Sequence, residues 1–218
     1  MNPDTYPARL EIDYPENLDR ATTFLRPILI IPIFAILALI TGSGETVVNT
    51  ITVDEAGEVL SRTSESGGGL AAGIFAATAL MIVFRQRYPR WWFDFTRELA
   101  RFGNRVAAYF SLLTDQYPST VEEQSVHLEL DYPDVEADLN RWLPLFKWLL
   151  AIPHYIVLLF LYVAGFFVVL AAWFAILATG RYPRAFFNYV VGVQRYGLRV
   201  WAYAFAMVTD RYPPFSLA

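Results

Sequence analysis

The chain has 218 residues, of which 56% are hydrophobic and only 17% are charged, and its formal net charge is −4. This composition, with its positive mean hydropathy, exceeds what a soluble domain of this length needs for its core and indicates a membrane protein. The sequence contains no cysteine, which excludes disulfides, thiolate catalysis and cysteine-ligated metals.

Matched Tyr-Pro dipeptides divide the chain into two similar units, residues 1–120 and 121–218. Seven tyrosines precede a proline, and six of them form three pairs that occur in the same order in both units. Repetition on this scale predicts a tandem duplication. The paired tyrosines are Tyr14 and Tyr132, Tyr88 and Tyr182, and Tyr117 and Tyr212.

Each unit begins with a short segment of alternating apolar and polar residues, Leu10 to Tyr14 in the first and Val126 to Tyr132 in the second. Such alternation is typical of half-buried strands. Because the two segments are equivalent in the duplication, we expect them to pair with each other on the cytoplasmic side. The proline after each tyrosine removes a backbone donor and so ends the strand.

Two apolar segments follow in each unit, near residues 24–41 and 69–84 in the first and 145–164 and 166–179 in the second. Between Pro144 and Thr179 the only charge is that of Lys147. A single helix over this stretch would be about 54 Å long, against a hydrocarbon core of roughly 30 Å. We therefore expect a fold-back at Gly165 and four spanning segments in all. The short segments leave bilayer thinning or a re-entrant hairpin open.

Charged residues at the ends of these segments predict the orientation. Arginines flank both hairpins, so the positive-inside rule places both termini and the central segment in the cytoplasm. The polar insert 42–68 is acidic, which suits the outer side, and it reads as a small β-hairpin. The expected chain is multi-pass.

An aromatic segment with a polar stripe follows each hairpin. The stripe residues are spaced by four, three and four, which places each set on one face of a helix. Burying two arginines at mid-bilayer would cost about 5 to 7 kcal/mol, so we expect these helices to lie in the interface. Three crossings per unit, which would give an inverted repeat, are the alternative. The stripes are Asp94, Glu98, Arg101 and Arg105, and Asn188, Gly192, Arg195 and Arg199.

The predicted fold is therefore an all-α integral membrane protein of two tandem units. Each unit contains a transmembrane helical hairpin and an amphipathic interfacial helix, with short cytoplasmic strands and a small extracytoplasmic insert. Small residues on the second apolar segment form a face expected to pack against another helix, between units or between protomers. These residues are Gly69, Gly73 and Ala77.

Four arginines are candidate ligands for anionic lipid headgroups or a substrate phosphate, although orientation at the interface explains them equally well. They are Arg101, Arg105, Arg195 and Arg199. His154 stands alone in an apolar helix, so we interpret it as a packing or hydrogen-bonding residue rather than a metal ligand. The sequence has no phosphate loop, nucleophile elbow or zinc-protease motif. We predict no catalytic residue, no metal site, no cofactor and no nucleic-acid partner.

The stretch from Gly180-Arg-Tyr-Pro-Arg-Ala-Phe-Phe-Asn to Leu217, together with Ala151-Ile-Pro-His154, resembles a bacterial membrane-protein family, domain of unknown function 4389. The first unit resembles it more loosely. The resemblance implies that the protein is located in the bacterial plasma (inner) membrane, and it assigns no activity. We expect a non-enzymatic scaffold or accessory subunit that binds membrane lipids and partner proteins, as a homo-oligomer or as a subunit of a membrane complex. The alternative is a small transporter or channel-like protein for a lipid or small solute at the interface of the units.

Overall fold

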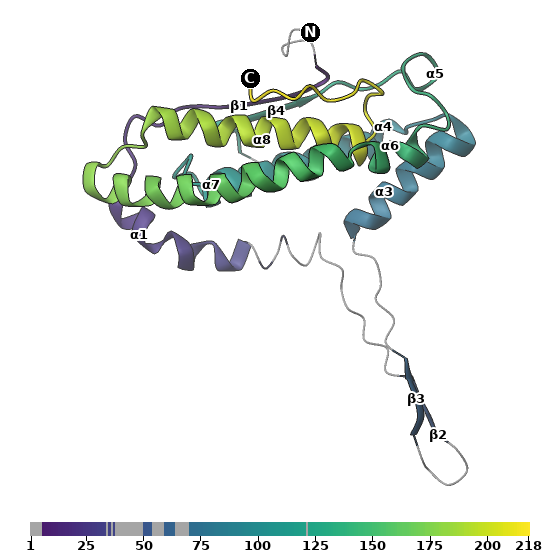
Figure 1. Cartoon of the computed structure of the whole chain (residues 1–218), viewed down its shortest axis with the longest axis horizontal. Helices are drawn as coiled ribbons and strands as arrows, with labels where there is room; N and C mark the ends of the chain where they lie inside the picture. The colour runs from purple at the N-terminus through teal and green to yellow at the C-terminus, as the bar shows by residue number, and fades with distance from the viewer. Residues whose placement is uncertain are drawn as a thin grey trace.

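A small antiparallel sheet lies over a layer of long helices (Figure 1). The computed structural model describes residues 6–33, 35, 37, 50–53, 59–63, 70–120 and 122–218. The described chain is mostly helical. Its elements are β1 (Ala8–Ile12), α1 (Arg20–Leu29), β2 (Thr50–Val53), β3 (Val59–Thr63), α3 (Leu70–Leu80), η2 (Met81–Arg85), α4 (Arg90–Phe110), β4 (Val126–Leu130), α5 (Val135–Asp138), α6 (Pro144–Leu150), α7 (Ile152–Thr179) and α8 (Arg184–Ala204).

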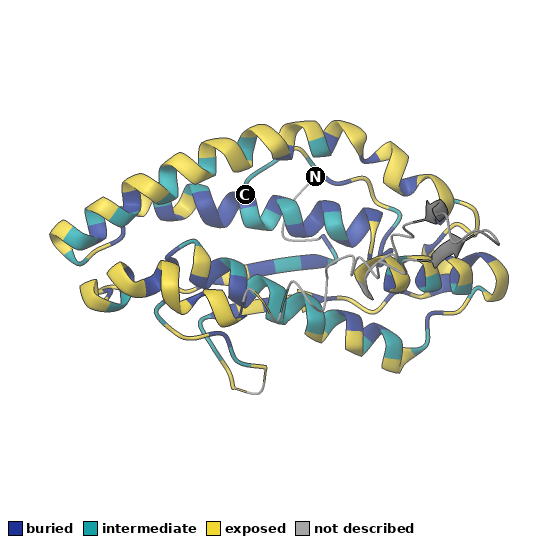
Figure 2. Cartoon of the chain, turned by 90° about the horizontal axis from the view of Figure 1, so that it is seen from below, coloured by how far each residue is buried: buried dark blue, intermediate teal, exposed yellow. Residues whose placement is uncertain are grey.

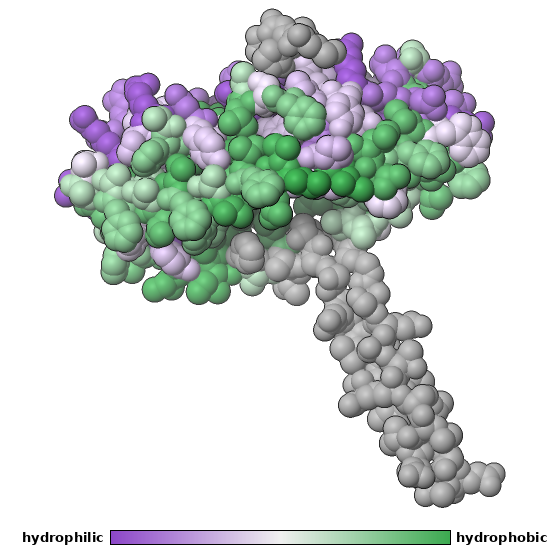
Figure 3. All heavy atoms as spheres, viewed as in Figure 1, coloured by the Kyte–Doolittle hydropathy of each residue, from purple (hydrophilic) through white to green (hydrophobic). Residues whose placement is uncertain are grey.

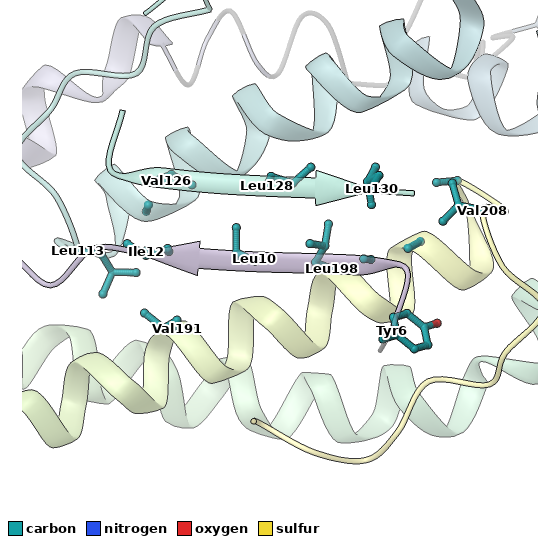
Figure 4. Close-up of a cluster of buried hydrophobic side chains, with 14 of the residues drawn as sticks. Tyr6, Leu10, Ile12, Leu113, Val126, Leu128, Leu130, Val191, Leu198 and Val208 are labelled. Carbon is teal, nitrogen blue, oxygen red and sulfur yellow. The ribbon is translucent and has the colours of Figure 1, made fainter. Parts of the chain in front are cut away.

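Strands β1 and β4 pair with each other, as the sequence predicts. The pairing is antiparallel, and Leu10 lies directly opposite Leu128. Alternate residues of both strands are buried, and this face packs on α8 and α4, where Val191 and Leu198 of α8 contact it (Figure 4). The main hydrophobic core therefore lies between the sheet and the two amphipathic helices.

The opposite face of the sheet is charged and exposed. Arg9 forms ion pairs with Glu129 and Asp131, at 3.2 and 2.8 Å, and His127 lies 3.2 Å from Asp13. Exposed pairs of this kind contribute at most about 1 kcal/mol each. Their main consequence is that this side of the protein is polar.

Helices α4 and α8 are the two predicted amphipathic helices, and each begins directly after the proline of a Tyr-Pro dipeptide. Proline fixes a φ suited to a helix start and has no N–H to leave unpaired. β4 packs on α4, whereas β1 packs on α8, so each strand covers the helix of the other half of the chain.

Helix α7 continues without interruption from Ile152 to Thr179, so the prediction of a fold-back at Gly165 is wrong. A Cβ at Gly165 would lie 4.0 Å from the Tyr189 ring of α8, an ordinary contact distance, so this glycine lies within a regular helix beside α8 rather than at a turn. The helix ends instead at Gly180, whose φ of 75° suits a glycine C-cap. The predicted hairpin of the second unit is therefore a single helix.

The apolar segments of the first half are described in part. α1 begins at Arg20 and is capped by Asp19, whose carboxylate accepts a hydrogen bond from the Ala21 N–H at 3.0 Å. α3 and the short π-helix η2 cover most of the second predicted segment. Residues 38–49 lie outside the described residues. Within the insert, β2 and β3 pair as an antiparallel hairpin, as predicted, and Figure 1 shows it apart from the helical body.

Two buried ion pairs attach the starts of the apolar segments to the chain that follows α4 and α8. Arg26 of α1 pairs with Asp115, and Lys147 of α6 pairs with Asp210 at 2.7 Å. Both cations are almost fully buried. Burial lowers the pKa of Lys147, and its hydrogen bond to Asp210 opposes that shift. Each aspartate belongs to a paired Tyr-Pro segment of the sequence.

Candidate lipid-binding site

A cavity of about 950 Å³ lies between α4 and α8. α4 contributes small side chains, among them Ala100, Gly103 and Ala107, and α8 contributes Gly197 and Trp201. These positions correspond between the two helices at a constant offset of 94 residues, with Gly103 matching Gly197 and Ala107 matching Trp201. The two helices therefore present equivalent faces to one shared space.

The remaining walls of the cavity come from α1, α3 and α7. Ile30 contributes from beside α1, Phe75 from α3, and Phe166 and Leu170 from α7. The lining is therefore mostly aliphatic and aromatic. Pockets of this volume and character are the usual sites for small apolar ligands.

A small polar group lies within this apolar lining. Gln194 donates a hydrogen bond from Nε2 to Ser111 Oγ at 3.3 Å, and Asn104 donates to the Ala100 carbonyl at 2.8 Å. Within the described part of the chain, Gln194 Oε1 has no hydrogen-bond partner.

One of the predicted arginines on each helix faces the sheet. Arg195 Nε donates to the Leu10 carbonyl at 2.7 Å, and Arg101 Nη2 reaches the Leu128 carbonyl at 3.5 Å. Arg101 is also paired with Glu98 at 2.6 Å. These two side chains connect α8 to β1 and α4 to β4.

The other two predicted arginines are more deeply buried. Arg105 donates to the Ser119 carbonyl at 2.5 Å, and burial lowers its pKa. Arg199 donates to the carbonyls of Ser216 and Ala218, so it holds the C-terminal tail on α8. The structure thus gives all four arginines partners inside the chain, and their binding to lipid stays a prediction.

The predicted small-residue face of α3 is exposed where it is described. Gly73 is exposed, and a Cβ added there would meet no atom within 4 Å, while Ala77 is half-buried. Gly69 lies outside the described residues. The face is therefore open to a partner helix, and its packing role stays a prediction.

His154 is fully buried in an aromatic cluster. Its Nδ1 lies 2.5 Å from the Tyr196 hydroxyl, and its ring stacks on Phe215 with centroids 4.2 Å apart. Among the described residues, no group of three or more histidine, aspartate or glutamate side chains could hold a metal ion. The contacts of His154 agree with its interpretation as a packing and hydrogen-bonding residue.

Large apolar side chains are exposed along the underside and one flank of the helical layer. Figure 2 shows this exposure along the whole outer edge of α7, and Phe160 and Phe167 are 70% and 62% exposed. Apolar surface on this scale marks an interaction site in a soluble or membrane-associated protein. Among the described helices, α7 alone has the length and apolar composition needed to cross a membrane.

Sequence reasoning missed the buried ion pairs and the cavity glycines. A signal for both was present in the repeat predicted from the sequence. Arg26 and Lys147 stand at similar positions of the two predicted units, each six residues after an arginine, Arg20 or Arg141. Gly103 and Gly197 are separated by the same 94 residues as the arginines of the two stripes. Their equivalent positions in the two units could have identified these charged residues and glycines as candidates for a structural role.

The comparisons with known proteins concern the second half of the chain. Residues 142–216, which include α6, α7 and α8, match the family model described as Domain of unknown function (DUF4389). No curated protein and no solved structure matches the chain. The second half of the chain is therefore similar to this family of unknown function.

Proposed function

We propose that the protein is a non-enzymatic, membrane-associated protein that holds a lipid acyl chain between α4 and α8. The observation that carries this proposal is the apolar cavity of about 950 Å³, lined by equivalent faces of the two helices. Each CH₂ group moved from water into such a site contributes about 0.8 kcal/mol, so a long acyl chain gains more than a small solute.

The proposal includes the duplication predicted from the sequence. Contacts between paired positions support it: the Tyr14 hydroxyl donates to the Tyr182 carbonyl at 2.5 Å, and the Tyr132 hydroxyl donates to the Tyr88 carbonyl. Under the duplication, these two hydrogen bonds are the same contact made twice, and Leu10 opposite Leu128 lies on the local twofold axis. The cavity then lies at the interface of two related units.

The exposed apolar surface gives a lipid a route to this site. The outer side chains of α7 are suited to hydrocarbon, and residues of the same helix, such as Gly165 and Val169, line the cavity. A membrane-bound protein would therefore keep its cavity next to lipid. The open small-residue face at Gly73 is available to a partner protein or a second copy, which fits an accessory or scaffold role.

Fluorescence quenching tests the proposal. Trp201 lines the cavity, whereas Trp142 is 60% exposed at the start of the matched domain. In nanodiscs made with acyl-brominated phosphatidylcholine, we expect Trp201 to contribute quenched emission. The quenched fraction should therefore fall in Trp201→Phe. Trp142→Phe is the control for the loss of one tryptophan. Emission from Trp201 that is insensitive to bromine would overturn the proposal.

A further inference from the structure

Helix α7 has the length of a membrane span, but its neighbours restrict how it can be placed. It packs lengthwise on α8, and α8 packs on β1. α7 and α8 run side by side beneath the sheet in Figure 1. If α7 stood across a bilayer, α8 and the sheet would stand at the same depth.

That placement is costly because the outer face of the sheet is charged. Arg9, Glu129 and Asp131 are 37%, 70% and 54% exposed at their side chains, and Glu11 is exposed as well. On the insertion scale, each such charge costs about 2.5 to 3.5 kcal/mol at the centre of a bilayer. The two-stranded sheet also has open edges, which hydrocarbon does not accommodate. An upright α7 is therefore incompatible with the fold around it.

The distribution of hydropathy points to a different placement. Figure 3 shows hydrophilic residues along the upper side of the body and hydrophobic residues along its middle and lower parts. The boundary runs along the long axis of the molecule, which is also the direction of α7 in the same view. The apolar layer is thus parallel to the 28-residue helix, whose length is about 42 Å.

Cations lie at both ends of the exposed apolar helix. Arg141 precedes α6 and α7, while Arg181 and Arg184 follow α7, and all three are exposed. Arginine at the rim of an apolar surface complements anionic phospholipid headgroups. A lipid leaflet is the partner that matches both the apolar face and this charged rim.

We infer that α7 lies in the plane of the membrane, with its exposed face in the hydrocarbon of one leaflet and the sheet in the water on that same side. This inference rests on the proposed membrane association. It replaces the predicted crossings of the second unit with a one-sided insertion. Amphipathic in-plane helices bury their apolar face about 5 to 10 Å into the boundary between headgroups and acyl chains.

Cysteine accessibility tests the placement, because the natural chain has no cysteine. Glu136→Cys reports on the chain before α7, Arg181→Cys on the chain after it, and Glu129→Cys on the sheet. Asp138→Cys is a second reporter beside Glu136 in case that variant folds poorly. Each variant is treated with a membrane-impermeant maleimide in right-side-out and inverted vesicles.

We expect every one of these positions to react from the same side. Phe160→Cys, in the middle of α7, should react only after detergent is added. Reaction of positions 136 and 181 from opposite sides, or ready reaction of position 160 in intact vesicles, would overturn the in-plane placement alone. Absence of the protein from the membrane fraction would instead overturn the proposed membrane function together with this inference.

Discussion

The Nζ atom of Lys147 lies 2.7 Å from the carboxylate of Asp210, and the lysine is fully buried. Removing one partner of a buried ion pair leaves an uncompensated charge and costs about 3 to 5 kcal/mol. We therefore expect Asp210→Asn to lower the unfolding midpoint markedly in detergent. Asp115→Asn, at the equivalent pair with Arg26, should have an effect of similar size.

The double variant Lys147→Met, Asp210→Asn is the control for this pair. It removes the buried charge, so it should recover part of the stability that Asp210→Asn loses. Equal stability of Asp210→Asn and the unsubstituted protein would show that the contact contributes nothing to folding.

Buried tyrosines predict a loss of stability at alkaline pH. Burial raises the pKa of Tyr88 to about 12, from an ordinary value of 10.0. Its stabilising contribution is complete below pH 10, where the hydroxyl is neutral in both states, and it is lost as the pH rises from 10 through 12. Two pKa units correspond to about 3 kcal/mol.

Thermal unfolding between pH 9 and pH 12 measures this loss. Tyr88→Phe should show a shallower decline than the unsubstituted protein, since phenylalanine has no proton to release. Tyr117→Phe removes a tyrosine that is 49% exposed and is the matched control. The same decline in all three proteins would contradict the assignment to Tyr88.

Substitution of Arg199 tests whether this residue stabilises the fold or binds lipid. Arg199 is 5% exposed and donates to the carbonyls of Ser216 and Ala218. Hydrogen bonds from a charged group contribute about 1.5 to 3 kcal/mol each, so Arg199→Ala should lower the unfolding midpoint. Its binding to anionic vesicles should change less than twofold under conditions where it is folded.

Arg184 is exposed, so we expect its substitution, unlike that of Arg199, to weaken binding in the vesicle assay. A cation near a membrane surface contributes about 1 kcal/mol, so Arg184→Ala should weaken binding to anionic vesicles about fivefold. If Arg199→Ala weakens vesicle binding while its unfolding midpoint is unchanged, the lipid-headgroup role predicted from the sequence would hold for Arg199.

The strands and amphipathic helices could be predicted from the sequence because their patterns involve only neighbouring residues. Alternation in Leu10 to Tyr14 and the stripes on the two helices each depend on residues a few positions apart. The pairing of β1 with β4 was also predictable, since the two strands are equivalent under the duplication predicted from the sequence. These predictions needed no knowledge of the packing of distant segments.

The course of α7 could not be predicted in the same way. The fold-back at Gly165 assumed that the apolar run crosses a membrane, which sets its maximum length. In the fold, Gly165 lies beside Tyr189 of α8, and the Tyr189 hydroxyl donates to the Leu161 carbonyl at 3.1 Å. A glycine within a continuous helix and a glycine that ends a helix look alike in one sequence, because the packing that distinguishes them involves residues far along the chain.

The cavity was hidden for a related reason. Gly103 and Gly197 lie in regular helices, and nothing in their immediate sequence indicates a space between them. The arginine stripes attracted a lipid-binding interpretation because they are charged and repeated. The structure places Arg101 and Arg195 against the sheet and Arg105 and Arg199 against the segments that follow α4 and α8. The small residues of the same helices line the cavity.

Lipid occupancy of a cavity-filled variant tests the central claim most directly. A Cβ at Gly103 would meet no atom within 4 Å, so Gly103→Leu places a side chain in open space of the cavity lining. Gly73→Leu is the matched control, because Gly73 is also unobstructed and helical but does not line the cavity. Leucine is a better helix former than glycine by about 0.8 kcal/mol, so neither change should lower the unfolding midpoint.

Native mass spectrometry of the proteins purified in mild detergent measures the bound lipid. We predict that the unsubstituted protein and Gly73→Leu retain a phospholipid and that Gly103→Leu retains at least fivefold less. Equal lipid retention by Gly103→Leu, with its fold intact, would contradict the claim that the space between α4 and α8 holds an acyl chain.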